Sequence, residues 1–324
     1  MKKNIFAIIF VVVLFTFSLC SAEADHVTLP VGFIPSVQFA PFYAGIENGF
    51  FAEEGIDLEL DYNMEIDLVA LVGAGRMSFG VCSGEQVLLG REQGLPLVYI
   101  SNWYQNYPVG VVALADSGIS SMEDLKGKTV GIPVLSGASY IGFEAMLRKA
   151  GMTDSDVKLE VVGYTQSETL VMGKIDAAVI YTTNEPEQLK ALGYDINLFS
   201  VADVTTMVGN GLFTSEQMIR ENPDLVTRMT RAFVRSVAWT RENTEEAFEI
   251  CKKYVTGLAD AEDMELQKQV LYRSADFYDA GSAGIGRSDP AAWENMGGLL
   301  KEMGMISSDM EIAPAFTNDF VPEN

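Results

Sequence analysis

Five short segments of the chain concentrate side chains that could bind a small molecule: residues 35–38, 83–86, 102–108, 136–140 and 182–187. They are rich in aromatic, amide and hydroxyl groups, and none contains a Lys or an Arg. Rings offer flat apolar walls, and amides and hydroxyls read a ligand's polar edge. The chemistry indicated is reversible binding of a neutral or weakly basic ring. The residues expected to bind it are Gln38, Phe39, Tyr43, Ser83, Glu85, Trp103, Tyr104, Ser136, Tyr140, Asn184 and Glu185.

The densest aromatic group is Trp103, Tyr104 and Tyr107, which fall within five residues of one another. Polar-edged rings on a loop commonly form stacking walls for a planar ligand. The alternative is that these rings pack a junction inside the fold, and the sequence leaves both interpretations open.

Asn184-Glu185-Pro186 is the sharpest polar feature. Pro186 stops a strand and suits the first turn of a helix, where a carboxylate is favoured by the helix dipole. Glu185 could accept two hydrogen bonds from the amidine-like edge of an aminopyrimidine, or one from an ammonium group. The alternative is a carboxylate that serves only the helix start, and this alternative is stronger for Glu85.

An anion is a less suitable ligand for these segments. A pocket for sulfonate, nitrate or phosphate is usually completed by a cation or by the free amides of a helix N-terminus. Only the second device is available, at Ser136-Gly137-Ala138-Ser139.

Residues for catalysis and metal binding are scarce. The only histidine is His26, and the cysteines are Cys20, Cys82 and Cys251. Neither a Cys/His or Ser/His/Asp triad nor a His/Cys metal cluster can be assembled from this set in mid-chain. We expect no catalytic residue, no metal and no cofactor. Cys82 and Cys251 are expected as separately buried thiols, with a disulfide as the alternative in an oxidising compartment.

The elements that must position the five segments recur along the chain. Hydrophobic periodicity predicts strands at 27–34, 56–62, 77–82, 129–134, 157–164 and 175–181. It predicts helices between them at 39–48, 68–75, 140–150 and 167–173. Alignment of Val31 with Val130, Leu58 with Leu159 and Met77 with Ile175 gives offsets of 99, 101 and 98 residues. These offsets predict two copies of a βαβαβ unit, with helix-ending glycines at Gly55, Gly75, Gly151 and Gly173.

Each copy is expected to form an α/β lobe with a doubly wound, mainly parallel sheet flanked by helices. Ligands bind beyond the carboxyl ends of strands in such sheets, so two facing lobes define a cleft. Further helices are predicted at 223–243, 245–254, 261–278 and 290–303, wrapping the first lobe. We expect lobe 1 at 25–112 plus 212–324 and lobe 2 at 113–211, with crossing segments near 109–116 and 207–212.

Composition limits the choice of partner. The 324 residues are 48% hydrophobic and 21% charged, which indicates a globular protein. The 22 Lys and Arg against 45 Asp and Glu give a net charge of −23, which repels nucleic acid and anionic membranes.

The N-terminus is typical of a secretory signal. Lys2 and Lys3 precede an apolar run from Ile5 to Leu19, and Ala22-Glu23-Ala24 follows it. We expect cleavage after Ala24 and a mature protein in the periplasm or at the outer face of the cytoplasmic membrane, with a lipoprotein anchored at Cys20 as the alternative.

Four strings carry a family resemblance: VGFIPSVQFAPFYAGIENGFFAEEGIDLEL (31–60), ASYIGFEAMLRKAG (138–151), GKIDAAVIYTTNEP (173–186) and FTNDFVP (316–322). The chain resembles the NMT1/THI5-like solute-binding proteins of ABC transporters over essentially all of its mature length. The resemblance implies the two-lobed periplasmic-binding-protein fold of type II, and a permease with its ATPase as partners of a monomer.

The resemblance also suggests ligands. Pyrimidine carriers of this group hold a flat ring between aromatic side chains with an acid at its amino edge, a pattern that Trp103, Tyr104, Tyr140 and Glu185 could supply. A thiamine pyrimidine precursor is therefore the favoured ligand. Riboflavin, a nitrate, taurine or other sulfonate ligand, and a ligand-sensing role are the alternatives. The related fungal pyrimidine synthase sacrifices an active-site histidine and carries a cysteine-rich iron motif, both missing from this chain, so an enzyme is not expected.

Overall fold

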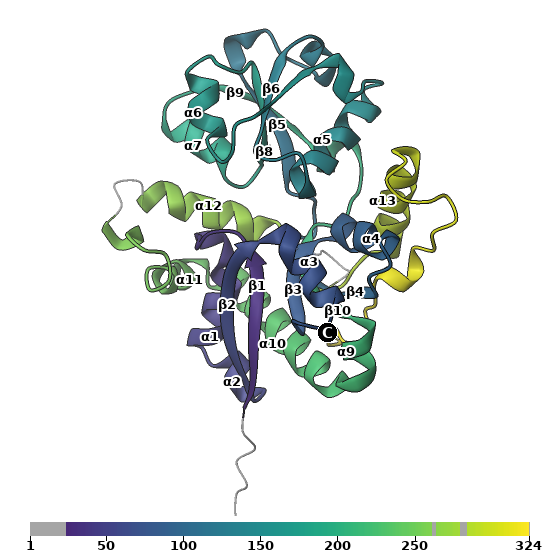
Figure 1. The fold of residues 1–324 in the computed structure, drawn as a ribbon. Helices are drawn as coiled ribbons and strands as arrows, with labels where there is room; N and C mark the ends of the chain where they lie inside the picture. The colour runs from purple at the N-terminus through teal and green to yellow at the C-terminus, as the bar shows by residue number, and fades with distance from the viewer. Residues whose placement is uncertain (1–23, 261–263, 279–283, 324) are drawn as a thin grey trace, which may run out of the picture.

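The computed structural model describes residues 24–260, 264–278 and 284–323, and Figure 1 shows two lobes. The predicted signal peptide lies outside these residues except for Ala24. Lobe 1 contains a two-stranded sheet, β1-β2, and a three-stranded sheet in the order β3-β10-β4. Lobe 2 contains one five-stranded sheet in the order β7-β6-β8-β5-β9.

The strands are β1 (Asp25–Gly32), β2 (Ile56–Met64), β3 (Phe79–Ser83), β4 (Leu97–Asn102), β5 (Val109–Leu114), β6 (Thr129–Ile132), β7 (Lys158–Val161), β8 (Ala177–Tyr181), β9 (Ile196–Ser200) and β10 (Asn210–Ser215). The helices up to the end of lobe 2 are α1 (Ala40–Glu47), α2 (Phe50–Glu53), α3 (Glu65–Gly73), α4 (Gly84–Glu92), α5 (Gly137–Lys149), α6 (Gln166–Val171), α7 (Glu185–Ala191) and α8 (Val201–Val204). The remaining helices are α9 (Glu216–Glu221), α10 (Pro223–Glu242), α11 (Thr244–Cys251), α12 (Met264–Asp276) and α13 (Pro290–Glu302).

The first two strands of the two predicted copies fold alike, whereas the third strand differs: β8 pairs with β6 in the lobe 2 sheet, but β3 pairs with β10 in a sheet separate from β1 and β2, so the single sheet expected for lobe 1 is wrong. β1 pairs in parallel with β2, and β6 pairs in parallel with β7, so the first two strands of each copy are equivalent. The four predicted helix-ending glycines all have positive φ, namely Gly55 (69°), Gly75 (69°), Gly151 (71°) and Gly173 (66°). A residue with a Cβ is strained there, which explains the recurrence of glycine.

Each lobe also receives one antiparallel strand. β5 runs antiparallel to β8 and β9, and β10 runs antiparallel to β3 and β4. The other strands of the lobe 2 sheet share one direction, so the sheet is mainly parallel as expected. The segments predicted to cross, 109–116 and 207–212, thus contain β5 and the start of β10. The expected lobe boundaries at 112/113 and 211/212 fall inside β5 and β10. The apolar residues of these two strands are buried in the sheets of their lobes.

The chain crosses between the lobes twice, and the two crossings are joined by hydrogen bonds. The amides of Trp103 and Tyr104 both donate to the carbonyl of Asn210, each at 2.9 Å. The hydroxyl of Tyr99 donates to the carbonyl of Gly209 at 3.0 Å. The two crossings therefore form one compact junction between the lobes rather than two separate linkers.

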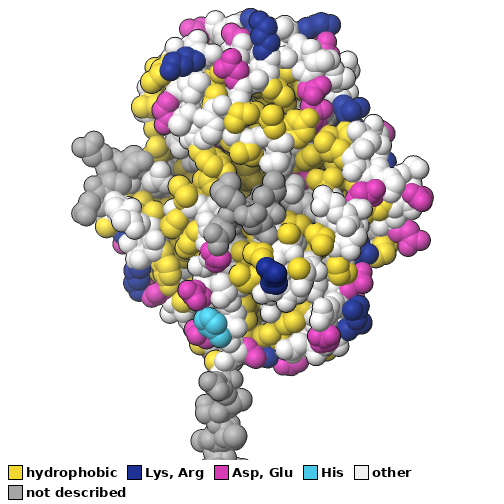
Figure 2. Space-filling view, viewed as in Figure 1, with side chains coloured by type: hydrophobic (Ala, Val, Ile, Leu, Met, Phe, Trp, Pro, Cys, Tyr) yellow, Lys and Arg dark blue, Asp and Glu magenta, His cyan; other side chains and the backbone are white. Residues whose placement is uncertain are grey.

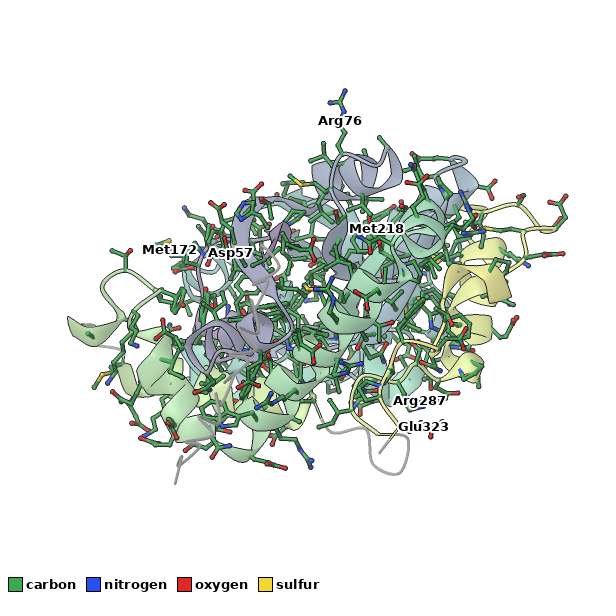
Figure 3. All side chains as sticks on the ribbon, turned by 90° about the horizontal axis from the view of Figure 1, so that it is seen from below. Asp57, Arg76, Met172, Met218, Arg287 and Glu323 are labelled. Atoms are coloured by element: carbon green, nitrogen blue, oxygen red, sulfur yellow. The ribbon has the colours of Figure 1, made fainter. Side chains whose placement is uncertain are left out.

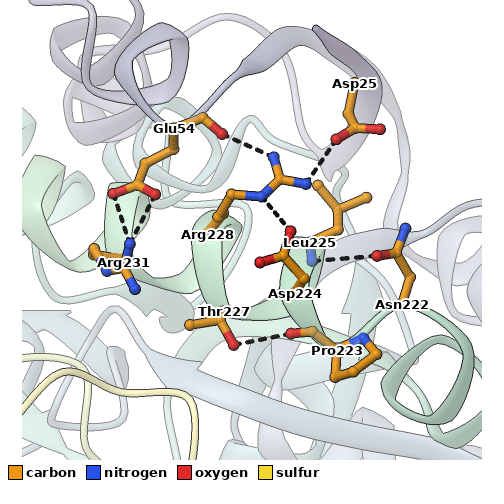
Figure 4. A network of polar contacts seen from close by, with 9 residues as sticks. All are labelled: Asp25, Glu54, Asn222, Pro223, Asp224, Leu225, Thr227, Arg228 and Arg231. Atoms are coloured by element: carbon orange, nitrogen blue, oxygen red, sulfur yellow. Dashed lines mark hydrogen bonds and ion pairs between the residues drawn. The ribbon is translucent and has the colours of Figure 1, made fainter. Parts of the chain in front are cut away.

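The C-terminal helices pack mainly on lobe 1, as predicted. The Asn222 side chain accepts from the Leu225 amide at 3.4 Å and so caps α10. Figure 4 shows how Arg228 of α10 ties this helix to the start of the chain, donating to Asp25 (2.7 Å), to Asp224 (2.8 Å) and to the Glu54 carbonyl (2.8 Å). α12 departs from the prediction, because it also reaches lobe 2 and contacts α7 beneath that lobe (Figure 1).

The two cysteines of the described chain lie in different hydrophobic clusters. Cys82 packs with residues of α4, β4 and lobe 2, and Cys251 packs with residues of α1 and α10. Both are buried thiols, so the expectation of separate burial is confirmed over the disulfide. Within the described residues, no helix combines the length and apolar character that crossing a bilayer requires.

Gly209→Ala is expected to destabilise the protein. A Cβ at this position would lie 2.6 Å from the Tyr104 carbonyl oxygen and 2.9 Å from that of Asn106, so the paired crossings would have to separate. We expect a loss of roughly 1–3 kcal/mol, as for other overpacked sites. Urea unfolding followed by circular dichroism measures it. Gly298→Ala, where a Cβ meets no atom within 4 Å, is the control and should be neutral or stabilising. Equal stability of the two variants would contradict the proposed crowding.

Candidate functional site

A cavity of about 440 Å³ lies between the lobes, where loops that follow strands of lobe 1 face loops that follow strands of lobe 2. Figure 2 shows hydrophobic side chains gathered on both sides of the boundary between the lobes. The cavity is lined by Val31, Gly32, Phe33, Gln38, Phe39, Val81, Gln86, Trp103, Tyr104, Pro133, Val134, Ser136, Gly137, Ala138, Ser139, Tyr164, Gln166, Tyr181, Asn184, Glu185 and Asn210.

The structure brings most of the predicted site residues together at this cavity. Those that line it are Gln38, Phe39, Trp103, Tyr104, Ser136, Asn184 and Glu185. Those that do not are Tyr43, Ser83, Glu85 and Tyr140.

Local packing explains why four of the predicted residues do not line the cavity. Tyr43 is buried one turn behind Phe39, where its ring stacks on Tyr254 with centroids 4.3 Å apart. Ser83 and Glu85 are buried behind the cavity wall, where the Ser83 hydroxyl donates to the Glu85 carboxylate. α5 begins at Gly137, earlier than the predicted helix at 140, so Tyr140 lies along the helix and packs partly against the core.

Several lining residues were missed by the sequence prediction. Tyr164 and Gln166 follow β7, a strand whose carboxyl end was not included among the five segments. Phe33 directly follows β1, before the first of those segments. Asn210 starts β10, and because β10 is antiparallel its first residue lies at the same sheet edge as the last residues of its neighbours. Applying the strand-end rule to every strand finds the first three, whereas Asn210 requires knowledge of strand direction.

The cavity wall in lobe 1 is built from stacked rings. The Trp103 and Tyr104 rings are nearly parallel, with centroids 5.0 Å apart and an interplanar angle of 7°. Phe39 lies 5.7 Å from Trp103, and Phe42 meets the same indole edge-on at 5.3 Å. Such mutual packing holds the wall residues in place before any ligand arrives.

Contacts between described residues link the lobes across the cavity. The Gln38 amide nitrogen donates to the Thr183 hydroxyl at 3.0 Å, and the Tyr181 hydroxyl donates to the Asn210 side-chain carbonyl at 3.5 Å. At the rim, the Phe33 and Tyr164 rings meet edge-on with centroids 5.1 Å apart.

Glu185 is the one Asp or Glu among the described residues that line the cavity. Its side chain is only 8% exposed, and it accepts a hydrogen bond from the Tyr181 amide at 3.0 Å. Burial raises the pKa of Glu185 to about 7, against the opposing effect of these amide donors and of Asn184. Near neutral pH the carboxyl group can therefore accept a hydrogen bond when ionised or donate one when protonated.

Glu85 holds a neighbouring lining residue instead of lining the cavity itself. One carboxylate oxygen accepts from the Gln86 amide at 3.3 Å as well as from Ser83, and burial raises the pKa of this fully buried group. With one N–H of its amide engaged by Glu85, Gln86 has its second N–H and its carbonyl oxygen left for a ligand.

No Lys, Arg or His is among the described residues that line the cavity. Arg76, near the end of α3, points away from the body of the protein (Figure 3), and Arg91 is paired with Glu216 at 2.8 Å. Within the described ranges, no three His, Cys, Asp or Glu side chains are placed to hold a metal ion. The site can thus bind flat apolar surface and a few hydrogen-bonding groups, without a cation to neutralise a full negative charge.

Fold and site together define an α/β protein of the two-lobed periplasmic-binding-protein type, with its cavity at the hinge. Residues 36–247 match the NMT1/THI5 like family, and the chain belongs to that family.

Two relatives and one solved structure illustrate the range of this likeness. The chain is 36% identical to the riboflavin-binding protein RibY of Chloroflexus aurantiacus, over 92% of this chain and 86% of that protein. It is 26% identical to a 4-amino-5-hydroxymethyl-2-methylpyrimidine phosphate synthase of Legionella pneumophila, over 94% of both. The fold is similar to that of the periplasmic aliphatic sulphonate binding protein SsuA from Escherichia coli, with a TM-score of 0.73, 14% identity and coverage of 94% and 95%.

The buried Glu185 carboxyl predicts a pH-dependent stability. Because its pKa is raised from 4.5 to about 7, the folded protein binds more protons than the unfolded chain between these values. Stability relative to Glu185→Gln should therefore fall as pH rises from about 4.5 to 7, by roughly 3 kcal/mol at most.

Urea unfolding of both proteins at several pH values measures this difference. Glu294→Gln, which removes an exposed carboxylate of α13, is the control for the loss of one charge. Parallel pH profiles of the native chain and Glu185→Gln would show that Glu185 is not perturbed.

Proposed function

We propose that this chain is an extracytoplasmic solute-binding protein that closes its lobes around a flavin such as riboflavin. The observation that carries the proposal is the cavity of about 440 Å³ with a stacked aromatic wall, polar edges from both lobes and no lining cation among the described residues. A ligand of several fused rings uses this volume better than a single pyrimidine ring does. Each 100 Å² of ring surface that is buried contributes about 2.5 kcal/mol.

The polar edge of a flavin suits the groups opposite the aromatic wall. Its ring carbonyls need hydrogen-bond donors, which the amino end of α5 at Gly137 and Ala138 and the amides of Gln38 and Asn184 can supply. The identity to a riboflavin-binding protein over most of both chains supports the same ligand class. The cavity volume and the identity to a riboflavin-binding protein thus favour riboflavin over the thiamine precursor that the sequence analysis favoured.

An aminopyrimidine of the thiamine-precursor type is the second candidate, and Glu185 is the observation that favours it. A buried carboxylate beside an aromatic wall can accept hydrogen bonds from an amino group and its ring neighbour. The chain is also similar to a pyrimidine phosphate synthase, at 26% identity. Its identity to the riboflavin-binding protein RibY is higher, at 36%, which supports a carrier rather than an enzyme.

In this proposal, the partners of the protein are the components of a membrane transporter. The lobes would deliver the ligand as a closed monomer to an ABC permease and its ATPase, after export directed by residues 1–24. A sensor that reports ligand occupancy would use the same closed state. The net charge of −23 argues against nucleic acid as a partner.

Purification under native conditions tests the flavin proposal. We expect a yellow preparation or, after removal of any carried ligand, quenching of riboflavin fluorescence with a dissociation constant in the micromolar range or below. Taurine, nitrate and an aminopyrimidine are compared with riboflavin by calorimetry under the same conditions. Tight sulfonate binding without heterocycle binding would overturn the proposal.

Glu185→Gln distinguishes the two heterocycles. Loss of the charged acceptor should weaken binding of an aminopyrimidine at least roughly tenfold, in line with one charge-assisted hydrogen bond. Riboflavin, whose carbonyls need donors, should be little affected. Calorimetry with both ligands gives the ratio, and equal losses for the two would argue against this role of Glu185.

A further inference from the structure

A chain of side-chain hydrogen bonds runs through lobe 2 and ends at the cavity. The Ser167 hydroxyl donates to Gln188 Oε1 at 2.9 Å, and Gln188 Nε2 donates to Asn184 Oδ1 at 3.2 Å. Asn184 directly precedes Glu185, and both residues line the cavity. Ser167, Gln188 and Asn184 are called the amide chain below.

The amide chain has a direction. A side-chain amide has one accepting and one donating end, so the orientation of Gln188 sets that of Asn184. With its carbonyl oxygen engaged by Gln188, Asn184 has its N–H donors left for a partner at the cavity, which it lines. Ser167 and Gln188 do not line the cavity themselves.

Gln188 and Ser167 instead line a second, outer groove of about 790 Å³. α6 and α7 form one side of this groove, and Glu265, Leu266 and Gln269 of α12 form the other. Side chains on this outer face can be changed without altering the surface that the ligand touches.

We propose that Gln188 is a positioning residue for ligand selectivity, because it makes Asn184 present an N–H donor, rather than its carbonyl, to the ligand. The ligand must then carry an acceptor opposite Asn184. This part rests on the proposed function, since a ring carbonyl of a flavin is that acceptor.

Gln188→Glu tests the direction of the amide chain. A carboxylate at 188 only accepts, so Asn184 should turn its N–H toward it and present Oδ1 to the cavity. We expect riboflavin binding to weaken at least roughly tenfold. Gln188→Leu, which imposes no orientation, should lie between the native chain and Gln188→Glu. The matched control is Gln269→Glu, which adds the same charge to the same groove from α12, where Gln269 bonds Glu265 at 3.0 Å.

A double-mutant cycle separates positioning from a structural effect. In an Asn184→Ala background, Gln188→Glu should cause no further loss of riboflavin binding, because the residue it acts through is gone. Asn184 makes no side-chain cap to α7, so its truncation leaves that helix start intact. An equal loss in both backgrounds, or an equal loss in Gln269→Glu, would overturn the proposal.

A measurement without ligand keeps the inference independent of the flavin assignment. In protein labelled with ¹⁵N on asparagine side chains, the Asn184 NH₂ signal is identified by its disappearance in Asn184→Ala. It should shift in Gln188→Glu and Gln188→Leu but not in Gln269→Glu. An unmoved signal would overturn the positioning role, whereas a shifted signal in a protein that binds no riboflavin would overturn only the proposed ligand.

Discussion

The carbonyl of Asn210 is the point on which the architecture depends, because it accepts the amides of both Trp103 and Tyr104. These hydrogen bonds join the two crossings of the chain into one junction between the lobes. They also fix the backbone of the two rings that form the aromatic wall, and Asn210 itself lines the cavity. The junction between the lobes and the aromatic wall are therefore the same piece of structure.

The two copies of the repeat place an acid at corresponding positions but give it different surroundings. In lobe 1, α4 starts directly after β3, so Glu85 turns into the core and holds Gln86. In lobe 2, residues 182–184 separate β8 from α7, which carries Glu185 out to the cavity wall. Three residues of loop thus decide which carboxyl group can meet a ligand.

Beyond the junction, α4 of lobe 1 packs against α5 of lobe 2 within one hydrophobic cluster, and further contacts cross between the lobes at the cavity and at α12. Gln38 bonds Thr183, Phe33 meets Tyr164, and Arg273 of α12 lies 3.4 Å from Glu187 of α7. The hydrogen bond and the ion pair among these contribute little each, because water competes for the same groups. In the proposed function, a ring held between the lobes would add apolar burial that neither lobe provides alone and would so favour a closed arrangement. The role that we propose for the amide chain is selectivity at the same place.

The sequence by itself determined the order of the repeated βαβαβ units, the helix-ending glycines, the C-terminal helices and seven of the residues that line the cavity. These features follow from local periodicity and from the rule that ligands bind beyond strand ends, so short stretches of sequence are enough to predict them. Only the tertiary structure decided the rest. The direction of β10 brings Asn210 to the site, the packing of α5 carries Tyr140 past it, and burial of Glu85 removes it from the wall. The contact of α12 with α7 cannot be predicted from the sequence, because it joins segments that are far apart in the chain. The hydrogen bond from Gln188 to Asn184 cannot be predicted either, because the sequence does not say which end of an amide faces its neighbour.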